Sequence, residues 1–81
     1  MRTVTVFVRD GCHLCADALA VLERLRARHP FVVEPVDIEA DDALHRRYLE
    51  RIPVVAIDGE ELSDFFVDEA AVLARVRSGD G

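Results

Sequence analysis

In the first half of the chain, the apolar residues first recur at every second position and then at the spacing of a helix. Val4, Val6 and Val8 share one side of the segment 3–8 and Phe7 takes the other, which predicts a strand with apolar residues on both faces. A helical period follows from Cys12 to about Arg28, and its apolar face consists of Leu14, Ala18, Val21, Leu22 and Leu25. His29-Pro30 ends this helix, because proline cannot continue it.

The second half predicts three more strands and two helices. The segment from Phe31 to Asp37 forms the second strand, and its Pro35 lacks a ladder donor, so the strand lies at an edge. A second helix runs from about Asp41 to Leu49, and its Arg46 and Arg47, together with Arg51 after its end, form a solvated face. A third strand runs from Pro53 to Ile57, and a hairpin turn at Asp58-Gly59 leads into a fourth strand near 60–65. A last helix runs from Glu69 to about Arg77, with Asp68 as its N-cap. The residues of this helix available for the core are Ala70, Val72, Leu73 and Val76.

Length and composition describe one small domain, residues 1–81, with 51% hydrophobic residues. No apolar run approaches the roughly 20 residues of a membrane span. The first strand begins directly after Met1-Arg2 and leaves no room for a signal peptide, so we expect a cytoplasmic protein. The formal net charge of −6 argues against a nucleic-acid partner, whose phosphates need neutralising.

The two cysteines, Cys12 and Cys15, stand together at the expected start of the first helix. Unpaired N–H groups and the positive end of the helix dipole favour the thiolate form of Cys12 there. Cys15 follows one turn later on the same face, where it can attack a mixed disulfide formed by Cys12. A Cys-x-x-Cys pair in this context is typical of a redox motif.

Other uses of the pair remain open. A structural disulfide would close too small a loop to remove much chain entropy. Zinc needs four ligands, and only His13, His29 and His45, from separate elements, could join the single cysteine pair. An iron–sulfur cluster shared between two chains suits soft thiolates. A redox-sensing binding domain without turnover would carry the same cysteines.

The order β-α-β-α-β-β-α, with Gly-Cys-His-Leu-Cys at 11–15 and Arg-Ile-Pro-Val-Val at 51–55, resembles a thioredoxin fold of the minimal glutaredoxin type. Within it, these motifs are similar to those of the small bacterial glutaredoxin-like proteins. The resemblance covers nearly the whole chain. It implies an α/β protein with a central mixed four-stranded sheet.

The resemblance also implies an enzyme, a thiol–disulfide oxidoreductase acting on protein or low-molecular-weight disulfides. Cys12 would be its nucleophile and Cys15 its resolving thiol. Arg9 matches a basic position that helps to stabilise the thiolate, and Pro53 matches a cis-proline that sits against the cysteines. The backbone of Ile52 would then face outward, where a substrate pairs with it as an added strand. His13 either adds positive charge near Cys12 or is an exposed bystander.

The chain departs from the glutaredoxin pattern where that family binds glutathione. His13-Leu14 replace the usual Pro-Tyr, and the expected glycine and acidic pairs fall at Ser63-Asp64 and Phe66-Val67. We therefore expect weak glutathione binding, with either glutathione or a thioredoxin-reductase-type system as electron donor. We expect a monomer without a cofactor, acting on a disulfide-containing protein or a small thiol substrate, with no nucleic-acid or membrane partner.

Overall fold

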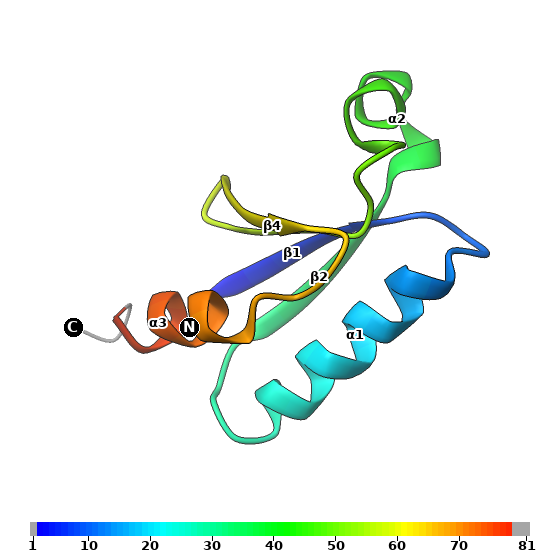
Figure 1. The fold of residues 1–81 in the computed structure, drawn as a ribbon. Coiled ribbons are helices and arrows are strands. Elements are labelled where there is room, and N and C mark those ends of the chain that lie inside the picture. The colour runs from blue at the N-terminus through cyan, green and yellow to red at the C-terminus, as the bar shows by residue number, and fades with distance from the viewer. Residues whose placement is uncertain (1, 79–81) are drawn as a thin grey trace.

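The computed structural model describes residues 2–78. Its elements follow the predicted order, with a short 3₁₀ turn added before the second helix (Figure 1). They are β1 (Thr3–Val8), α1 (His13–Arg26), β2 (Val32–Asp37), the 3₁₀ turn (Ile38–Ala40), α2 (Asp42–Tyr48), β3 (Val54–Ile57), β4 (Glu60–Asp64) and α3 (Glu69–Ser78).

The strands form one mixed sheet in the order β2-β1-β3-β4. β1 pairs in parallel with β2 and antiparallel with β3, and β3 pairs antiparallel with β4. The prediction that Pro35 lies in an edge strand is confirmed, because β2 is the outer neighbour of β1. The four-stranded mixed sheet that the resemblance implied is confirmed.

The sheet carries a core on each face, because neighbouring residues of a strand point to opposite sides. Val4 and Val6 of β1 pack with α1 and α3 on one face. Phe7 and Val54 pack with α2 on the other, where the ring of Phe7 stacks on Tyr48 at 4.2 Å between centroids. Figure 1 shows the same layers, with α1 and α3 on one side of the sheet and α2 on the other.

The expected turns and caps are confirmed. Asp58 and Gly59 both have positive φ, 52° and 84°, as a tight hairpin turn with the twist of its strands requires. The Asp68 carboxylate accepts a hydrogen bond from the Ala71 N–H at 3.1 Å and so caps α3. In residues 2–78 no helix has the length and apolar character needed to cross a membrane.

Two residues assigned to the core lie at the surface instead. Leu14 is 50% exposed, and Cys15 occupies the buried face of α1 in its place. The buried stripe of this helix runs through Cys15, Ala18, Leu22 and Leu25, so Leu14 falls on its flank, about 100° round the helix from Cys15. Ala70 is likewise exposed, because α3 turns Val72 and Val76 toward the sheet.

Candidate functional site

Three segments that are distant in sequence meet at one end of the sheet. Phe7 pairs with Val54, so the loop that leaves β1 toward α1 lies at the same end as the peptide bond that enters β3. Phe65 follows β4 at this end, and its N–H donates to the carbonyl of Pro53 at 2.9 Å. The register of the sheet thus gathers the cysteine loop, the proline segment and the segment after β4.

Cys12 is the N-cap residue of α1, with an extended backbone and a sulfur that accepts the N–H of Cys15 at 3.1 Å. Gly11, at φ 80°, turns the chain into this position. Cys15 is only 2% exposed, whereas Cys12 is half-buried. A hydrogen bond and a helix N-terminus directed at the Cys12 sulfur both favour its thiolate.

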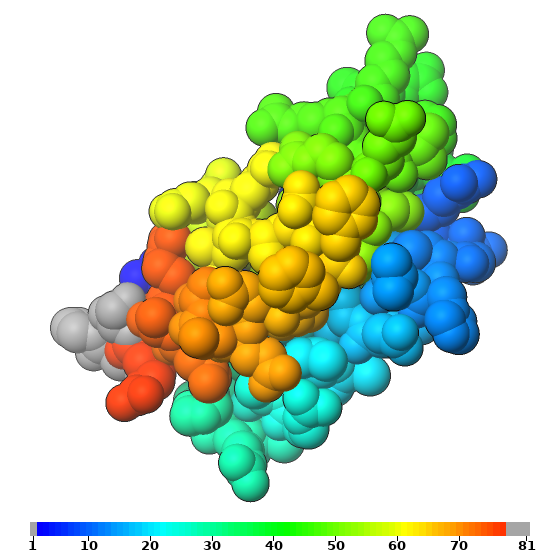
Figure 2. Space-filling view, viewed as in Figure 1, coloured from blue at the N-terminus to red at the C-terminus, as the bar shows by residue number. Residues whose placement is uncertain are grey.

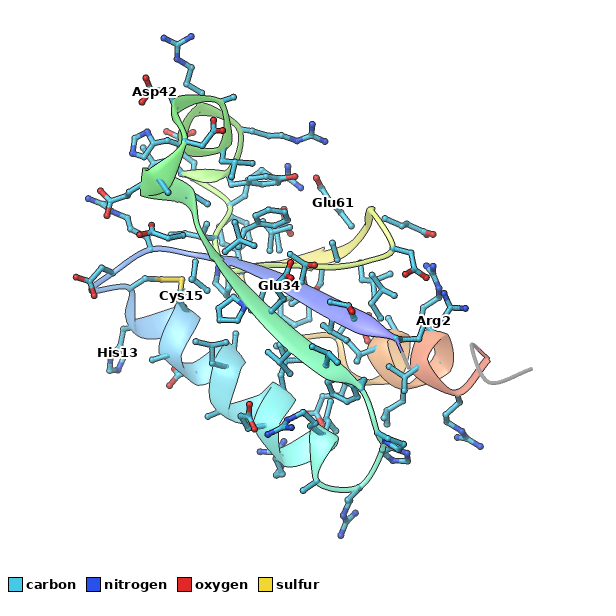
Figure 3. The ribbon with its side chains drawn as sticks, turned by 180° about the vertical axis from the view of Figure 1, so that it is seen from behind. Arg2, His13, Cys15, Glu34, Asp42 and Glu61 are labelled. Atoms are coloured by element: carbon cyan, nitrogen blue, oxygen red, sulfur yellow. A yellow bond between two sulfur atoms is a disulfide. The ribbon has the colours of Figure 1, made fainter. Side chains whose placement is uncertain are left out.

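The two cysteines are joined as a disulfide with their Cα atoms 5.2 Å apart (Figure 3). They line an open hollow of about 310 Å³ together with Arg9 and Asp37. The Arg9 Nε lies 3.6 Å from an Oε atom of Glu39, and both side chains are nearly half exposed. The Arg9 charge is therefore at the mouth of the hollow, but a carboxylate shares it.

Of the other site residues proposed from the sequence, Pro53 is buried, Ile52 is half-buried and His13 is exposed. The Ile52–Pro53 bond is cis, as predicted, and Pro53 is fully buried. The Ile52 N–H donates to the carbonyl of Tyr48 at 3.1 Å, which leaves its carbonyl as the group that an added strand could use. His13 is exposed and does not line the hollow, and in Figure 3 it extends away from the disulfide.

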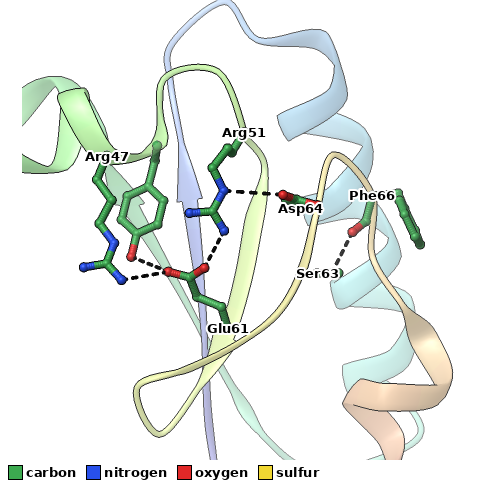
Figure 4. Close-up of polar contacts among 7 residues, drawn as sticks. Arg47, Arg51, Glu61, Ser63, Asp64 and Phe66 are labelled. Carbon is green, nitrogen blue, oxygen red and sulfur yellow. Dashed lines mark hydrogen bonds and ion pairs between the residues drawn. The ribbon is translucent and has the colours of Figure 1, made fainter.

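Sequence reasoning missed a polar cluster between α2 and β4 (Figure 4). The Glu61 carboxylate accepts hydrogen bonds from Arg47 at 3.3 Å, from the Tyr48 hydroxyl at 3.0 Å, and from Arg51. The Arg51 Nε also donates to Asp64 at 3.4 Å. Arg46 and Arg47 are exposed, as expected of a solvated face, although Arg47 pairs with Glu61. The prediction was wrong for Arg51, which is half-buried because β4 places Glu61 and Asp64 opposite it.

This cluster, Arg47, Tyr48, Arg51, Glu61 and Asp64, connects to the site through the backbone. The Arg51 carbonyl accepts the Phe65 N–H at 3.2 Å, so the residue that binds Glu61 also anchors the segment after β4. The hydrogen bond from Arg51 is the largest cause that lowers the pKa of Glu61, and partial burial opposes it. Burial, followed by the hydrogen bond to Glu61, raises the pKa of Tyr48.

Glu61→Gln should lower the free energy of unfolding at pH 7 by about 1 kcal/mol, because a charge-assisted hydrogen bond becomes a neutral one. The pKa of Glu61 is lower in the folded chain than in the unfolded chain. Its stabilisation is therefore complete above the unfolded value of roughly 4.3 and disappears as pH falls through the folded value. Urea unfolding at pH 7 and near pH 3 measures both limits.

The matched control is Glu34→Gln, an exposed glutamate of the edge strand β2. It should change the free energy of unfolding little at either pH. The difference between wild type and Glu61→Gln should shrink at the acidic pH. An equal difference at both values of pH would contradict an electrostatic role for Glu61.

The alternative of a metal site requires a cluster of metal-binding side chains. Within residues 2–78 no group of three or more His, Cys, Asp or Glu side chains is arranged to hold a metal ion.

Comparison with known proteins agrees with this geometry. A family model described as Glutaredoxin-like domain (DUF836) matches residues 3–77. The solution NMR structure of protein Ne2328 from Nitrosomonas europaea is 33% identical, with a TM-score of 0.82 over 91% of this chain and 89% of that one. A mutant thioredoxin from Halobacterium salinarum is 26% identical, with a TM-score of 0.65 over 95% of this chain and 73% of that one.

A malarial protein at 16% identity, with a TM-score of 0.67 over 96% of both chains, shares the fold alone. The search of curated proteins gave no match. The family match spans almost all of the described residues, and the structural match to a thioredoxin covers 95% of this chain. The chain therefore has a thioredoxin-like fold and belongs to the family of glutaredoxin-like domains (DUF836).

Proposed function

We propose that this chain is a thiol–disulfide oxidoreductase in which Cys12 is the nucleophile and Cys15 the resolving thiol. The observation that carries the proposal is the position of the Cys12 sulfur. It caps α1, accepts the Cys15 N–H at 3.1 Å and lies at an open hollow, whereas Cys15 is buried behind it. An accessible sulfur stabilised as a thiolate is what attack on a disulfide requires.

The reaction begins with the reduced chain. The Cys12 thiolate attacks one sulfur of the substrate disulfide, whose S–S bond breaks, and the other sulfur leaves as a thiolate that takes a proton from water. Cys15 then loses its proton, and its sulfur attacks the Cys12 sulfur in the mixed disulfide. The second substrate thiolate leaves and the Cys12–Cys15 disulfide forms. Two electrons have passed to the substrate, and an external thiol or dithiol returns them to the chain.

The remaining residues of the site support these steps without exchanging bonds. Arg9 at the mouth of the hollow stabilises the Cys12 thiolate, less strongly than an unpaired arginine because Glu39 shares its charge. The Ile52 carbonyl is the backbone group offered to a substrate strand. Pro53 beside it contributes no N–H to that strand. We assign His13 no step, because it is exposed and extends away from the disulfide.

The electron donor is a thiol system, either glutathione or a thioredoxin-reductase-type system. Glutathione is anionic, and the chain carries a formal net charge of −6. The chain also has neither the glycine pair nor the acidic pair with which glutaredoxins bind glutathione. Both features disfavour tight binding of glutathione. The donor is identified by offering the oxidised chain NADPH with either glutathione and glutathione reductase or thioredoxin reductase, and following the loss of NADPH.

Alkylation tests the assignment of the two thiols. In the reduced chain at about pH 6, iodoacetamide should label Cys12 at least roughly tenfold faster than Cys15, because only the thiolate reacts and Cys15 is buried. Peptide mapping by mass spectrometry after short exposures measures the two rates. Unfolding the chain in urea should make the rates similar. Faster labelling of Cys15 in the folded chain would reverse the assignment.

A further inference from the structure

An apolar groove lies next to the redox centre, between α1 and residues 65–67, with a volume of about 270 Å³. Figure 2 shows the gold segment after β4 beside the blue and cyan start of α1. Leu14, Phe65 and Phe66 line the groove and are 50%, 51% and 64% exposed. Within residues 2–78, three of the four large hydrophobic side chains that are exposed lie here. Exposed apolar side chains that cluster in this way indicate a binding surface, whereas singly scattered ones do not.

The segment after β4 is held in place although its conformation is unfavourable. Phe65 has φ 69°, a left-handed backbone that is strained for a residue with a side chain. Three hydrogen bonds hold it. The Phe65 N–H donates to the carbonyls of Pro53 at 2.9 Å and Arg51 at 3.2 Å. The Ser63 hydroxyl donates to the Phe66 carbonyl at 2.8 Å (Figure 4). The aromatic wall of the groove is therefore fixed by the same end of the sheet that carries the redox site.

The charge of the groove restricts what can occupy it. Asp17 is the one charged side chain among the lining residues. It is exposed and forms no ion pair within residues 2–78. A free carboxylate repels an anion such as glutathione and attracts a lysine or arginine. The complementary ligand is therefore an apolar side chain accompanied by a basic one.

The groove is separate from the hollow that the cysteines line, but both of its walls are tied to the segments that form the redox site. Leu14, at one wall, lies between the two cysteines in the chain, and Phe65, at the other, bonds to the Pro53 carbonyl. A substrate joined to Cys12 has its next residues within about 3.8 Å per Cα step of its own cysteine. Those residues are the part of a protein substrate that reaches this groove.

We propose that the groove between α1 and residues 65–67 binds the apolar, basic segment that flanks a cysteine in a protein disulfide, so that the chain selects proteins over glutathione. The inference rests on the proposed function, because the occupant is delivered by the mixed disulfide on Cys12. The covalent steps are those of disulfide exchange and need no further reactant.

Single-turnover kinetics test this selection. The reduced chain is mixed with symmetrical disulfides of three short peptides, identical except at the two residues after cysteine: Phe-Arg, Ser-Arg and Phe-Glu. The Phe-Arg peptide should react roughly tenfold faster than Ser-Arg, from burial of the ring, and faster than Phe-Glu. Phe66→Ser should reduce the first ratio and Asp17→Asn the second. Val32→Ser, at an exposed apolar residue of β2 outside the groove, should leave both ratios unchanged.

A binding measurement separates this inference from the proposed function. The oxidised chain, labelled with ¹⁵N, is titrated with the S-methylated Phe-Arg peptide, S-methylated Ser-Arg peptide and reduced glutathione. The Phe-Arg peptide alone should shift the amide signals of residues 65–67 and of the start of α1. Equal rates for all peptides without such shifts would overturn the groove and leave the oxidoreductase standing. The shifts without reduction of any disulfide would establish a peptide site and overturn the oxidoreductase.

Discussion

Cys12→Ser should abolish disulfide reduction, with a loss of at least roughly 10³-fold, as is usual when an enzyme loses its nucleophile. A serine hydroxyl is not ionised near neutral pH and does not exchange with disulfides. Serine is nevertheless a favoured N-cap residue, so α1 keeps its first turn and the hollow keeps its shape. Reduction of a small neutral disulfide and of a protein disulfide, followed with each variant, measures the loss.

The control for this variant is stability rather than activity. Cys12→Ser should unfold at the same urea concentration as the reduced wild-type chain, because neither has the disulfide and both have a capped helix. Retained turnover by a folded Cys12→Ser chain would show that Cys12 is not the attacking group. Cys15 would then be the remaining candidate, although it is only 2% exposed.

Cys15→Ser should convert the chain from a catalyst into a trap. Cys12 keeps its place at the end of α1 and still attacks the substrate, but the thiol that would release the mixed disulfide is gone. Release then depends on an external thiol reaching the Cys12 sulfur, which is half-buried. Adducts with protein substrates should accumulate to nearly one per chain and be visible on a non-reducing gel.

The double variant Cys12→Ser, Cys15→Ser is the matched control, because it should form no adduct. Adding dithiothreitol should release the trapped substrate from Cys15→Ser. If Cys15→Ser instead turns over at the wild-type rate, then resolution uses a thiol of the substrate or of a small reductant, and Cys15 has no part in catalysis. None of these results tests the groove between α1 and residues 65–67, which is tested by the peptide experiments described above.

The polar cluster around Glu61 connects α2 and β4 to the segments that form the site. Arg51 joins Glu61 and Asp64 through its side chain and Phe65 through its carbonyl. It also stands two residues before Pro53 in the chain. The cluster therefore stabilises the proline segment and one wall of the groove together. Stability and substrate selection should consequently respond in parallel to changes at Arg51, more than to changes at the exposed Arg46.

Local signals in the sequence were enough for the elements and the redox motif. Alternation in β1, the helical period of α1 and the Asp58-Gly59 turn each depend on residues a few positions apart. Pro35 indicated an edge strand because proline lacks an N–H in any context. The placement of Cys12 and Cys15 at a helix start followed from the Gly11 turn between a strand and an apolar period, and the structure confirms that placement.

Contacts between distant segments were decided only by the tertiary structure. Glu61 meets Arg51 because β4 runs antiparallel beside β3, with a register shift between Val55 and Ala56. Arg9 meets Glu39 because the 3₁₀ turn follows β2 beside the end of β1. Leu14 satisfies the helical period yet lies exposed, since the sheet covers the stripe through Cys15. A periodic pattern specifies which residues share a face, but the packing of other elements specifies which face is buried. The groove beside the cysteines exists for that reason: its two walls come from segments that only the sheet brings together.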